Sequence, residues 1–266
     1  MGGAERNARK RRQQRTSVGK AASASAGVSR VTIVAIAAVV VLAAVVVGGV
    51  IWSKAGSDGT SGKKIPVADA PGKLDEKASR DGVSVVRGSE DATADIDIYE
   101  DFMCPACGQF EASYGDQIEQ RIESGELRVR YHVLPMLMEY SNPAGYSLES
   151  ANSALCAADE GKFERFHDSL FESQPNEGGR GYDDDQLTQL GRDMGIEGNE
   201  FAQCVADGEY DDELNEKLDD VLDNPDLKSD KGGGGASFGT PTVTSDGEIV
   251  DTSGEWLAEL IEKHED

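Results

Sequence analysis

Two cysteines separated by two residues, Cys104 and Cys107, are the part of this 266-residue sequence best suited to chemistry. Such a pair can form a disulfide and exchange it with another thiol, or it can bind a metal ion. A strand-like alternating run (95–99) precedes the pair, and an apolar pattern with helical spacing follows it and stops near Gly125. The spacing therefore predicts that Cys104 lies at the N-terminus of a helix, where free backbone N–H groups and the helix dipole stabilise a thiolate.

Thiol-disulfide exchange is the chemistry that this arrangement favours. Cys104 would be the nucleophilic sulfur, and Cys107, one helical turn later, would resolve the mixed disulfide. A pKa of Cys104 below the free value of about 8.5 makes the disulfide easier to reduce and the protein a better oxidant. Pro105 suits the first turn because it has no N–H to leave unpaired. We predict no cofactor for this reaction.

A metal site and a purely structural disulfide are the alternatives for the same pair. Tetrahedral zinc needs two further ligands, and the sequence offers these candidates: His132, His167, His264, Cys156 and Cys204. No second CxxC and no HxxxH motif is present, so we assign no metal ligands. His167 lies in a helical pattern and is predicted to pack there.

The N-terminal residues indicate the compartment. Residues 1–30 contain eight Lys or Arg and a single acid, although the whole chain has a net charge of −24. The following run, 31–51, carries no charge, and as a helix it would span roughly 30 Å, the thickness of a hydrocarbon core. We therefore predict a single transmembrane anchor at 31–52. The positive-inside rule places 1–30 in the cytoplasm and the rest of the chain outside.

This topology explains the basic tail without nucleic-acid binding, and no nucleic-acid partner is predicted. The apolar run is longer than the ~7 to 15 residues usual in a signal peptide, which favours an uncleaved anchor. The prediction for localisation is a single-pass cell-membrane protein with an extracytoplasmic domain.

Outside the cytoplasm cysteines are normally oxidised, and four are present. The tight spacing of Cys104 and Cys107 favours their pairing with each other, which leaves Cys156 for Cys204. Both of these lie in helical patterns, so we predict a structural disulfide that joins two helices. A redox relay or a pair of free buried thiols is the alternative.

The remaining chain predicts a mixed α/β domain. Residues 53–82 are rich in Gly, Ser, Asp, Lys and Ala and predict a flexible linker. Strand patterns follow at 83–87, 95–99, 127–133, 237–244 and 248–250, and a final helix at 254–263. About 90 residues after the third strand pattern (143–231) have apolar residues at helical spacing. Asp246-Gly247 is a hairpin signal.

Three stretches carry a resemblance to a known family. They are 99–107 (YEDFMCPAC), 156–163 (CAADEGKF) followed by Phe166 and His167, and 239–242 (GTPT). On these residues the sequence from 83 to 266 resembles the DsbA-like branch of the thioredoxin superfamily, in the membrane-anchored form of Gram-positive bacteria. The resemblance implies a thioredoxin-like fold with a helical insertion at about 143–231.

The same resemblance implies a function and further site residues. The Thr240–Pro241 bond would be cis and lie beside the CxxC pair, where the exposed backbone at Thr240 pairs with an extended substrate chain. The chain would oxidise cysteine pairs in unfolded or reduced exported proteins, and a membrane partner would reoxidise it.

Two departures from the family pattern leave other directions of electron flow open. The dipeptide between the cysteines is Pro-Ala, where the best-known oxidases have Pro-His. Ile98 occupies the position of a buried acid common in the superfamily, although Glu100 and Asp101 are close by. A reductase or isomerase, and a non-enzymatic metal-binding thiol protein, are therefore alternative functions.

Overall fold

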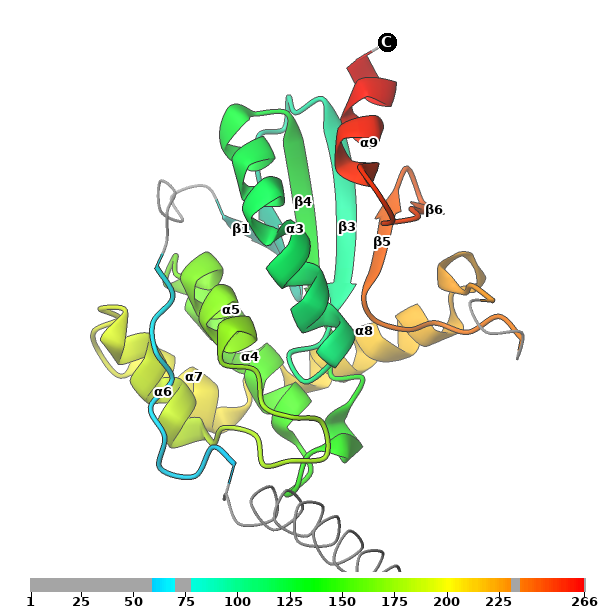
Figure 1. Ribbon diagram of the computed structural model, residues 1–266. Helices are drawn as coiled ribbons and strands as arrows, with labels where there is room; N and C mark the ends of the chain where they lie inside the picture. Colours follow the sequence, from blue (N-terminus) through cyan, green and yellow to red (C-terminus); the bar gives the residue numbers. More distant parts are fainter. Residues whose placement is uncertain (1–58, 70–77, 231–234, 266) are drawn as a thin grey trace, which may run out of the picture. The chain divides into compact units, whose positions relative to one another are not determined.

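A six-stranded sheet with the order β1-β2-β4-β3-β5-β6 forms the centre of the domain (Figure 1). The computed structural model describes residues 59–69, 78–230 and 235–265. The strands are β1 (Ser79–Asp81), β2 (Ser84–Arg87), β3 (Ala94–Glu100), β4 (Leu127–Val133), β5 (Thr242–Ser245) and β6 (Glu248–Ile249). The mixed α/β class predicted from the sequence is confirmed.

The centre of the sheet positions the CxxC pair. β3 runs parallel to β4 and antiparallel to β5, with Ile98 level with both Tyr131 and Val243. Apolar and acidic residues alternate along β3, so Ile98 is completely buried. Parallel neighbours require a crossover connection, and α3 (Pro105–Ser124) supplies it by crossing in front of β3 and β4 (Figure 1). The first turn of α3 therefore lies just beyond the end of β3.

Among the described residues, five helices lie between β4 and β5 and form the insertion. They are α4 (Tyr146–Asp159), α5 (Phe163–Glu172), α6 (Asp184–Asp193), α7 (Glu200–Asp207) and α8 (Asp211–Asp223), with short 3-10 turns at Met138–Tyr140 and Pro225–Leu227. α4 is the core of the insertion because ten of its residues are buried, many of them Ala or Ser. Small side chains let other helices approach it closely. A last helix, α9 (Trp256–Glu265), packs near β3.

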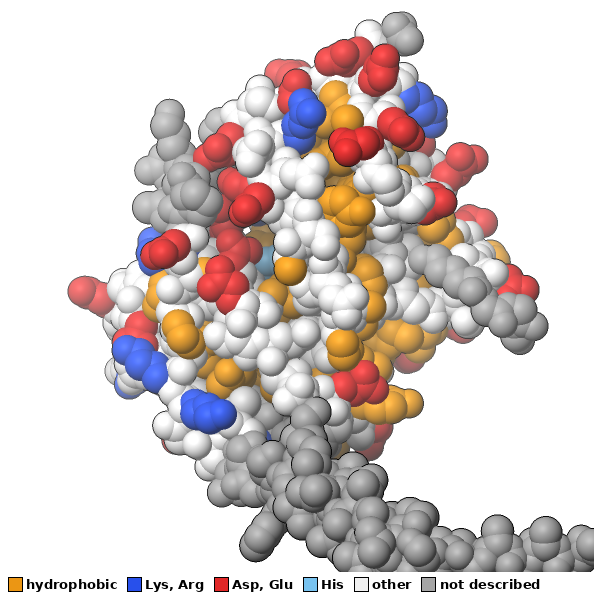
Figure 2. Space-filling view, in the orientation of Figure 1, with side chains coloured by type: hydrophobic (Ala, Val, Ile, Leu, Met, Phe, Trp, Pro, Cys, Tyr) orange, Lys and Arg blue, Asp and Glu red, His pale blue; other side chains and the backbone are white. Residues whose placement is uncertain are grey.

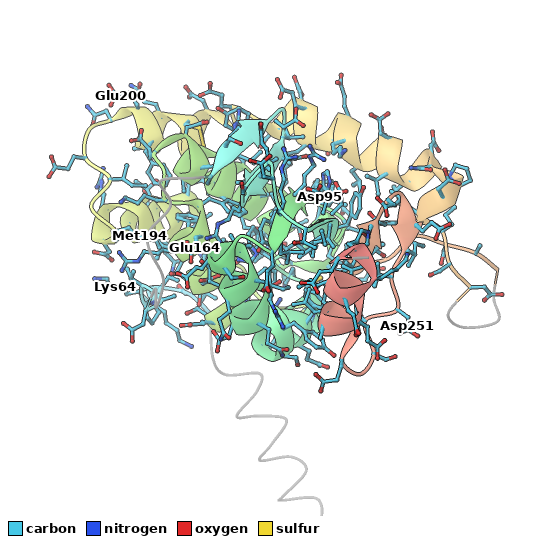
Figure 3. The ribbon with its side chains drawn as sticks, turned by 90° about the horizontal axis from the view of Figure 1, so that it is seen from above. Lys64, Asp95, Glu164, Met194, Glu200 and Asp251 are labelled. Atoms are coloured by element: carbon cyan, nitrogen blue, oxygen red, sulfur yellow. A yellow bond between two sulfur atoms is a disulfide. The ribbon has the colours of Figure 1, made fainter. Side chains whose placement is uncertain are left out.

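Part of the segment predicted as a flexible linker is instead packed against the domain. Within 59–69, Ile65 and Ala68 are only 1% and 2% exposed. The backbone N–H of Ala68 donates to Ser169 Oγ over 2.9 Å, and Lys64 forms a 2.9 Å ion pair with Asp193 at the end of α6, near Met194 (Figure 3). Composition suggested a linker, but a few apolar residues and backbone groups with partners suffice to hold the segment in place.

β1 is a second correction to the linker prediction, because Ser79–Asp81 pairs antiparallel with β2. Its residues alternate between exposed and half-buried, so the strand has almost no apolar pattern to reveal it. The ladder hydrogen bonds to β2, a strand buried along its whole length, account for its presence.

The predicted membrane anchor lies outside the described residues. Within the part of the chain that the structure describes, no helix has the length and apolar character needed to cross a bilayer. The tail at 1–30 and the anchor at 31–52 thus stay predictions.

Candidate active site

Cys104 is the N-cap residue of α3. Its backbone is extended (φ −74°, ψ 115°), and Pro105 begins the helix. The N–H of Cys107 and the N–H of Gly108 both donate to the Cys104 carbonyl, over 3.0 and 3.2 Å. The structure holds both Cys104 and Cys107 as free thiols, at 7% and 0% exposure.

The two thiols have opposite pKa shifts. A hydrogen bond from the Cys107 thiol, together with hydrogen bonds from the Thr240 side chain and from the backbone of Cys107 and Ala106, lowers the pKa of Cys104 to about 6, although burial opposes this. Burial and the adjacent Cys104 raise the pKa of Cys107 well above its usual value. At neutral pH the pair therefore carries one negative charge, on the sulfur at the helix N-terminus.

The loop before β5 lies against Cys104. The Thr240–Pro241 peptide bond is cis, and the carbonyl oxygen of Thr240 lies 3.3 Å from Cys104 Sγ. A carbonyl can only accept a hydrogen bond, so this contact favours the protonated thiol. A groove of about 680 Å³ runs along the same loop and reaches Ala106 and Phe238.

Asp101 lies beneath the CxxC pair and was not assigned a firm role from the sequence. It is fully buried, and its carboxylate accepts hydrogen bonds from the N–H of Met103 and of Leu137, each over 2.7 Å. Burial raises its pKa to about 6 even though these bonds and a third from Ser147 oppose the shift. Asp101 therefore fixes the turn into α3 and adds a titrating group below the thiols.

Gln174, after the end of α5, is a positioning residue that no sequence motif indicated. Its Nε2 donates to the carbonyl oxygens of Phe102 and Cys104, over 3.1 and 2.9 Å. Gly108 permits this approach, because a Cβ there would lie only 2.4 Å from Gln174 Oε1. The insertion thus holds the backbone that carries Cys104.

Glu100 and His167 form a buried ion pair next to this region. His167 Nε2 lies 2.6 Å from Glu100 Oε1, and burial leaves the two side chains 3% and 0% exposed. His167 also packs against the rings of Phe102, Tyr131 and Phe163. The predicted packing role is thus only part of its environment, since the ring also contacts the Glu100 carboxylate of β3.

The pairing of Cys156 with Cys204 expected from the sequence is present. The S–S distance is 1.99 Å and the Cα atoms are 6.0 Å apart. The bond joins α4 to α7, and Asn152 Nδ2 reinforces the junction by donating to the Cys204 carbonyl over 3.2 Å. This pair lies within the insertion, whereas Cys104 and Cys107 lie at the N-terminus of α3.

A family model described as thioredoxin matches residues 80–263 of the chain. Among solved structures, oxidised DsbA of Mycobacterium tuberculosis is 29% identical with a TM-score of 0.58, covering 69% of this chain and 93% of that one. Reduced DsbG, a disulfide bond oxidoreductase of the same organism, is 27% identical with a TM-score of 0.54, covering 67% and 90%. MdbA of Corynebacterium matruchotii, a thiol-disulfide oxidoreductase, shares the fold (23% identity, TM-score 0.57, 71% and 93% covered).

One relative is named as a protein kinase and not as an oxidoreductase. The serine/threonine-protein kinase PknE of Mycobacterium tuberculosis is 30% identical over 217 residues, which cover 79% of this chain. The chain spans about a third (36%) of the length of that protein.

A thioredoxin-like sheet, a CxxC pair at the start of α3 and a helical insertion before β5 together define the DsbA-like class of thioredoxin folds. The chain belongs to the thioredoxin family.

Proposed function

We propose that this chain is an extracytoplasmic thiol-disulfide oxidoreductase that oxidises cysteine pairs in exported proteins through a Cys104–Cys107 disulfide. The observation that carries the proposal is the split between the two thiol pKa values, about 6 for Cys104 and well above the usual value for Cys107. A low pKa makes Cys104 the better leaving group and stabilises the reduced chain. Both effects favour passing a disulfide to a substrate.

The reaction balances as two exchanges. A substrate thiolate attacks Cys104 Sγ of the Cys104–Cys107 disulfide, and Cys107 leaves as a thiolate that takes up a proton. A second substrate thiolate then attacks the substrate sulfur of the mixed disulfide, and Cys104 leaves as a thiolate. The substrate loses two electrons and gains a disulfide, while the chain becomes a dithiol.

The groove beside Thr240 and Pro241 supports an extended polypeptide as the substrate. It is formed largely by the 235–242 segment, and it is lined by Thr240, whose carbonyl oxygen contacts the Cys104 sulfur. An exposed backbone edge can pair with an extended chain without demanding a sequence, which suits a reaction with many unfolded clients. Reoxidation would fall to a membrane partner, consistent with an anchor at 31–52.

Site variants test the reaction directly. The full chain, oxidised at Cys104–Cys107, should introduce disulfides into a reduced, unfolded substrate protein. Cys104→Ser should lower the rate by more than about a thousandfold, because the Cys104–Cys107 disulfide that the substrate thiolate attacks can no longer form. Cys107→Ser, mixed with a substrate that carries a disulfide, should accumulate a mixed disulfide through Cys104, because the thiol that would displace the substrate is missing; mass spectrometry detects this species. Full activity in both variants would refute the proposal.

The direction of electron flow needs a separate measurement, because a reductase or isomerase would use the same residues. We expect the reduction potential of the Cys104–Cys107 pair to lie nearer the about −120 mV of a strong oxidase than the about −270 mV of thioredoxin. A value close to that of thioredoxin would favour a reductase. A metal-binding role of the pair has less support, since within the described residues no group of three or more candidate ligands includes either cysteine.

A further inference from the structure

A group of three metal-ligating side chains lies where the sheet, α3 and the insertion meet. Glu100 is at the end of β3, Glu111 is on α3 and His167 is on α5. One ligand atom from each lies within 4.8 Å of the others. A strand, the helix that follows it and a helix of the insertion thus bring two carboxylates and one imidazole together.

The imidazole of His167 is oriented as a metal-binding histidine would be. Its Nδ1 lies 3.0 Å from Asp168 Oδ1, while its Nε2 faces Glu100. A histidine that binds a metal through one nitrogen commonly donates its other N–H to a carboxylate, which fixes the tautomer and the ring. Asp168 occupies the position of that supporting carboxylate.

Two oxygens of the group have no donor from a third residue. Oε2 of Glu100 and Oε1 of Glu111 are buried, and among the described residues only a proton held between the two carboxyl groups themselves could serve them. Glu100 is completely buried, so the lost hydration of this oxygen is uncompensated. Facing carboxylates require positive charge, a proton or a cation, between them.

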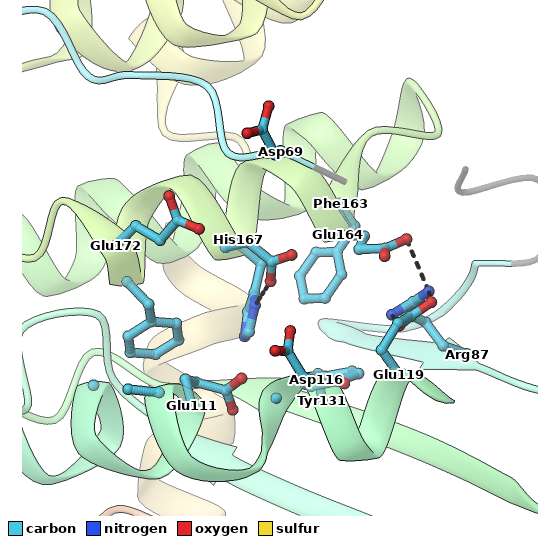
Figure 4. Close-up of a pocket in the computed structure, with 15 residues that line it drawn as sticks. Asp69, Arg87, Glu111, Asp116, Glu119, Tyr131, Phe163, Glu164, His167 and Glu172 are labelled. Carbon is cyan, nitrogen blue, oxygen red and sulfur yellow. Dashed lines mark hydrogen bonds and ion pairs between the residues drawn. The ribbon is translucent and has the colours of Figure 1, made fainter. Parts of the chain in front are cut away.

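A pocket of about 290 Å³ reaches Glu111 and His167 from the surface. Figure 4 shows both side chains and Asp116 directed into it, with Asp69 and Glu172 at its edge. Acidic side chains gather around this hollow in the space-filling view (Figure 2). An entrance lined by one sign of charge concentrates the opposite ion, here cations.

We propose that Glu100, Glu111 and His167 bind one divalent transition-metal cation, zinc or manganese, through two carboxylate oxygens and Nε2. The imidazole is the reason for a transition metal, because calcium and magnesium prefer ligand sets made entirely of oxygen. The bound cation joins β3, α3 and α5, so it stabilises the docking of the insertion onto the sheet. This site is distinct from the cysteine chemistry and does not depend on it.

The test uses the full chain with Cys104 and Cys107 oxidised, so that these thiols cannot bind metal. Zinc chloride and manganese chloride are titrated separately by calorimetry, with calcium chloride for comparison. We expect one equivalent of zinc or manganese to bind and to raise the melting temperature. Glu111→Gln should weaken binding by at least about tenfold, whereas Asp116→Asn, an exposed acid of the same pocket, should change it by less than about twofold.

Three results would contradict the proposed metal site or its cation. Absence of saturable zinc and manganese binding would overturn the site, as would equal affinity in Glu111→Gln and the unmodified chain. Calcium binding as tight as zinc binding would overturn the choice of cation. Should Glu111→Gln fail to fold, the visible spectrum of Co²⁺ bound to the unmodified chain decides, since mixed nitrogen and oxygen coordination is expected and its absence contradicts the site.

Discussion

The two cysteine pairs of this chain have similar exposure and opposite environments. Cys104 is 7% exposed and Cys204 is 8% exposed, while Cys107 and Cys156 are 0% and 1% exposed. Cys104 caps a helix, and hydrogen bonds from its neighbours lower its pKa to about 6. Cys156 and Cys204 lie inside α4 and α7, where backbone N–H groups are already bonded within the helix.

Solvent access therefore does not separate the reactive cysteine pair from the structural one. What differs is the supply of unpaired donors and the distance between the partners along the chain. Cys104 and Cys107 close a very short loop, so their disulfide constrains the unfolded chain little. Cys156 and Cys204 are 48 residues apart, so theirs constrains it strongly.

The largest expected effect in this comparison concerns stability. The double variant Cys156→Ala/Cys204→Ala should lose about 4 kcal/mol of unfolding free energy in the chain-entropy model and yet still oxidise a reduced substrate. Urea unfolding with Cys104–Cys107 kept oxidised measures the free energy of unfolding. A refolding assay with a reduced substrate protein measures the oxidation. Cys104→Ala is the matched control: exchange should be lost, and at about pH 5, where the Cys104 thiol is protonated, its stability should differ from that of the chain with Cys104 and Cys107 reduced by less than about 1 kcal/mol. Loss of exchange in the double variant would show that the second pair takes part in the redox reaction.

The next effect is a difference in pH dependence between the two thiols of the reduced chain. Alkylation of Cys104 by iodoacetamide should be half-maximal near pH 6 and fall by about tenfold per pH unit below that, because only the thiolate reacts. Cys107 should stay slow over the same range, since burial raises its pKa. Mass spectrometry of the alkylated peptides measures both rates, and half-maximal alkylation of Cys104 at about pH 8.5, the free value, would contradict the helix-cap argument.

The same shift has a consequence for stability with a definite sign. The folded-state pKa of Cys104 is lower than the unfolded-state value. The stability that its thiolate gives the reduced chain is therefore fully present above the ordinary thiol pKa, and it is lost as the pH falls through about 6. The disulfide between Cys156 and Cys204 does not titrate and contributes no such dependence.

The smallest effect concerns the contact through which the insertion holds the reactive pair. Gln174→Ala removes two hydrogen bonds to the carbonyls of Phe102 and Cys104 and should cost about 1 to 2 kcal/mol in urea unfolding. Gln189→Ala, on the exposed face of α6, is the control and should stay within about 0.5 kcal/mol. If the two variants had equal stability, the insertion would not support the CxxC turn through Gln174.

Sequence reasoning succeeded where the signal is local. The place of Cys104 at a helix start follows from the strand before it and the apolar spacing after it. The hairpin at Asp246-Gly247 follows from the turn residues and joins β5 to β6. The packed segment at 59–69 was missed because its small and polar composition matches that of a linker, while its partners lie more than a hundred residues away.

The sequence by itself determined the family resemblance, the helix that Cys104 caps and the short loop between the two cysteines, because each depends on neighbours along the chain. Tertiary structure alone decided which buried acids lie near the reactive pair and what they contact. Glu100, Glu111 and His167 come from a strand, a crossover helix and the insertion, and only folding brings them within 4.8 Å. Charges that lie close together in a low-dielectric interior interact strongly whatever their separation in sequence. The pattern of neighbouring residues along the chain does not indicate which charges will lie close together.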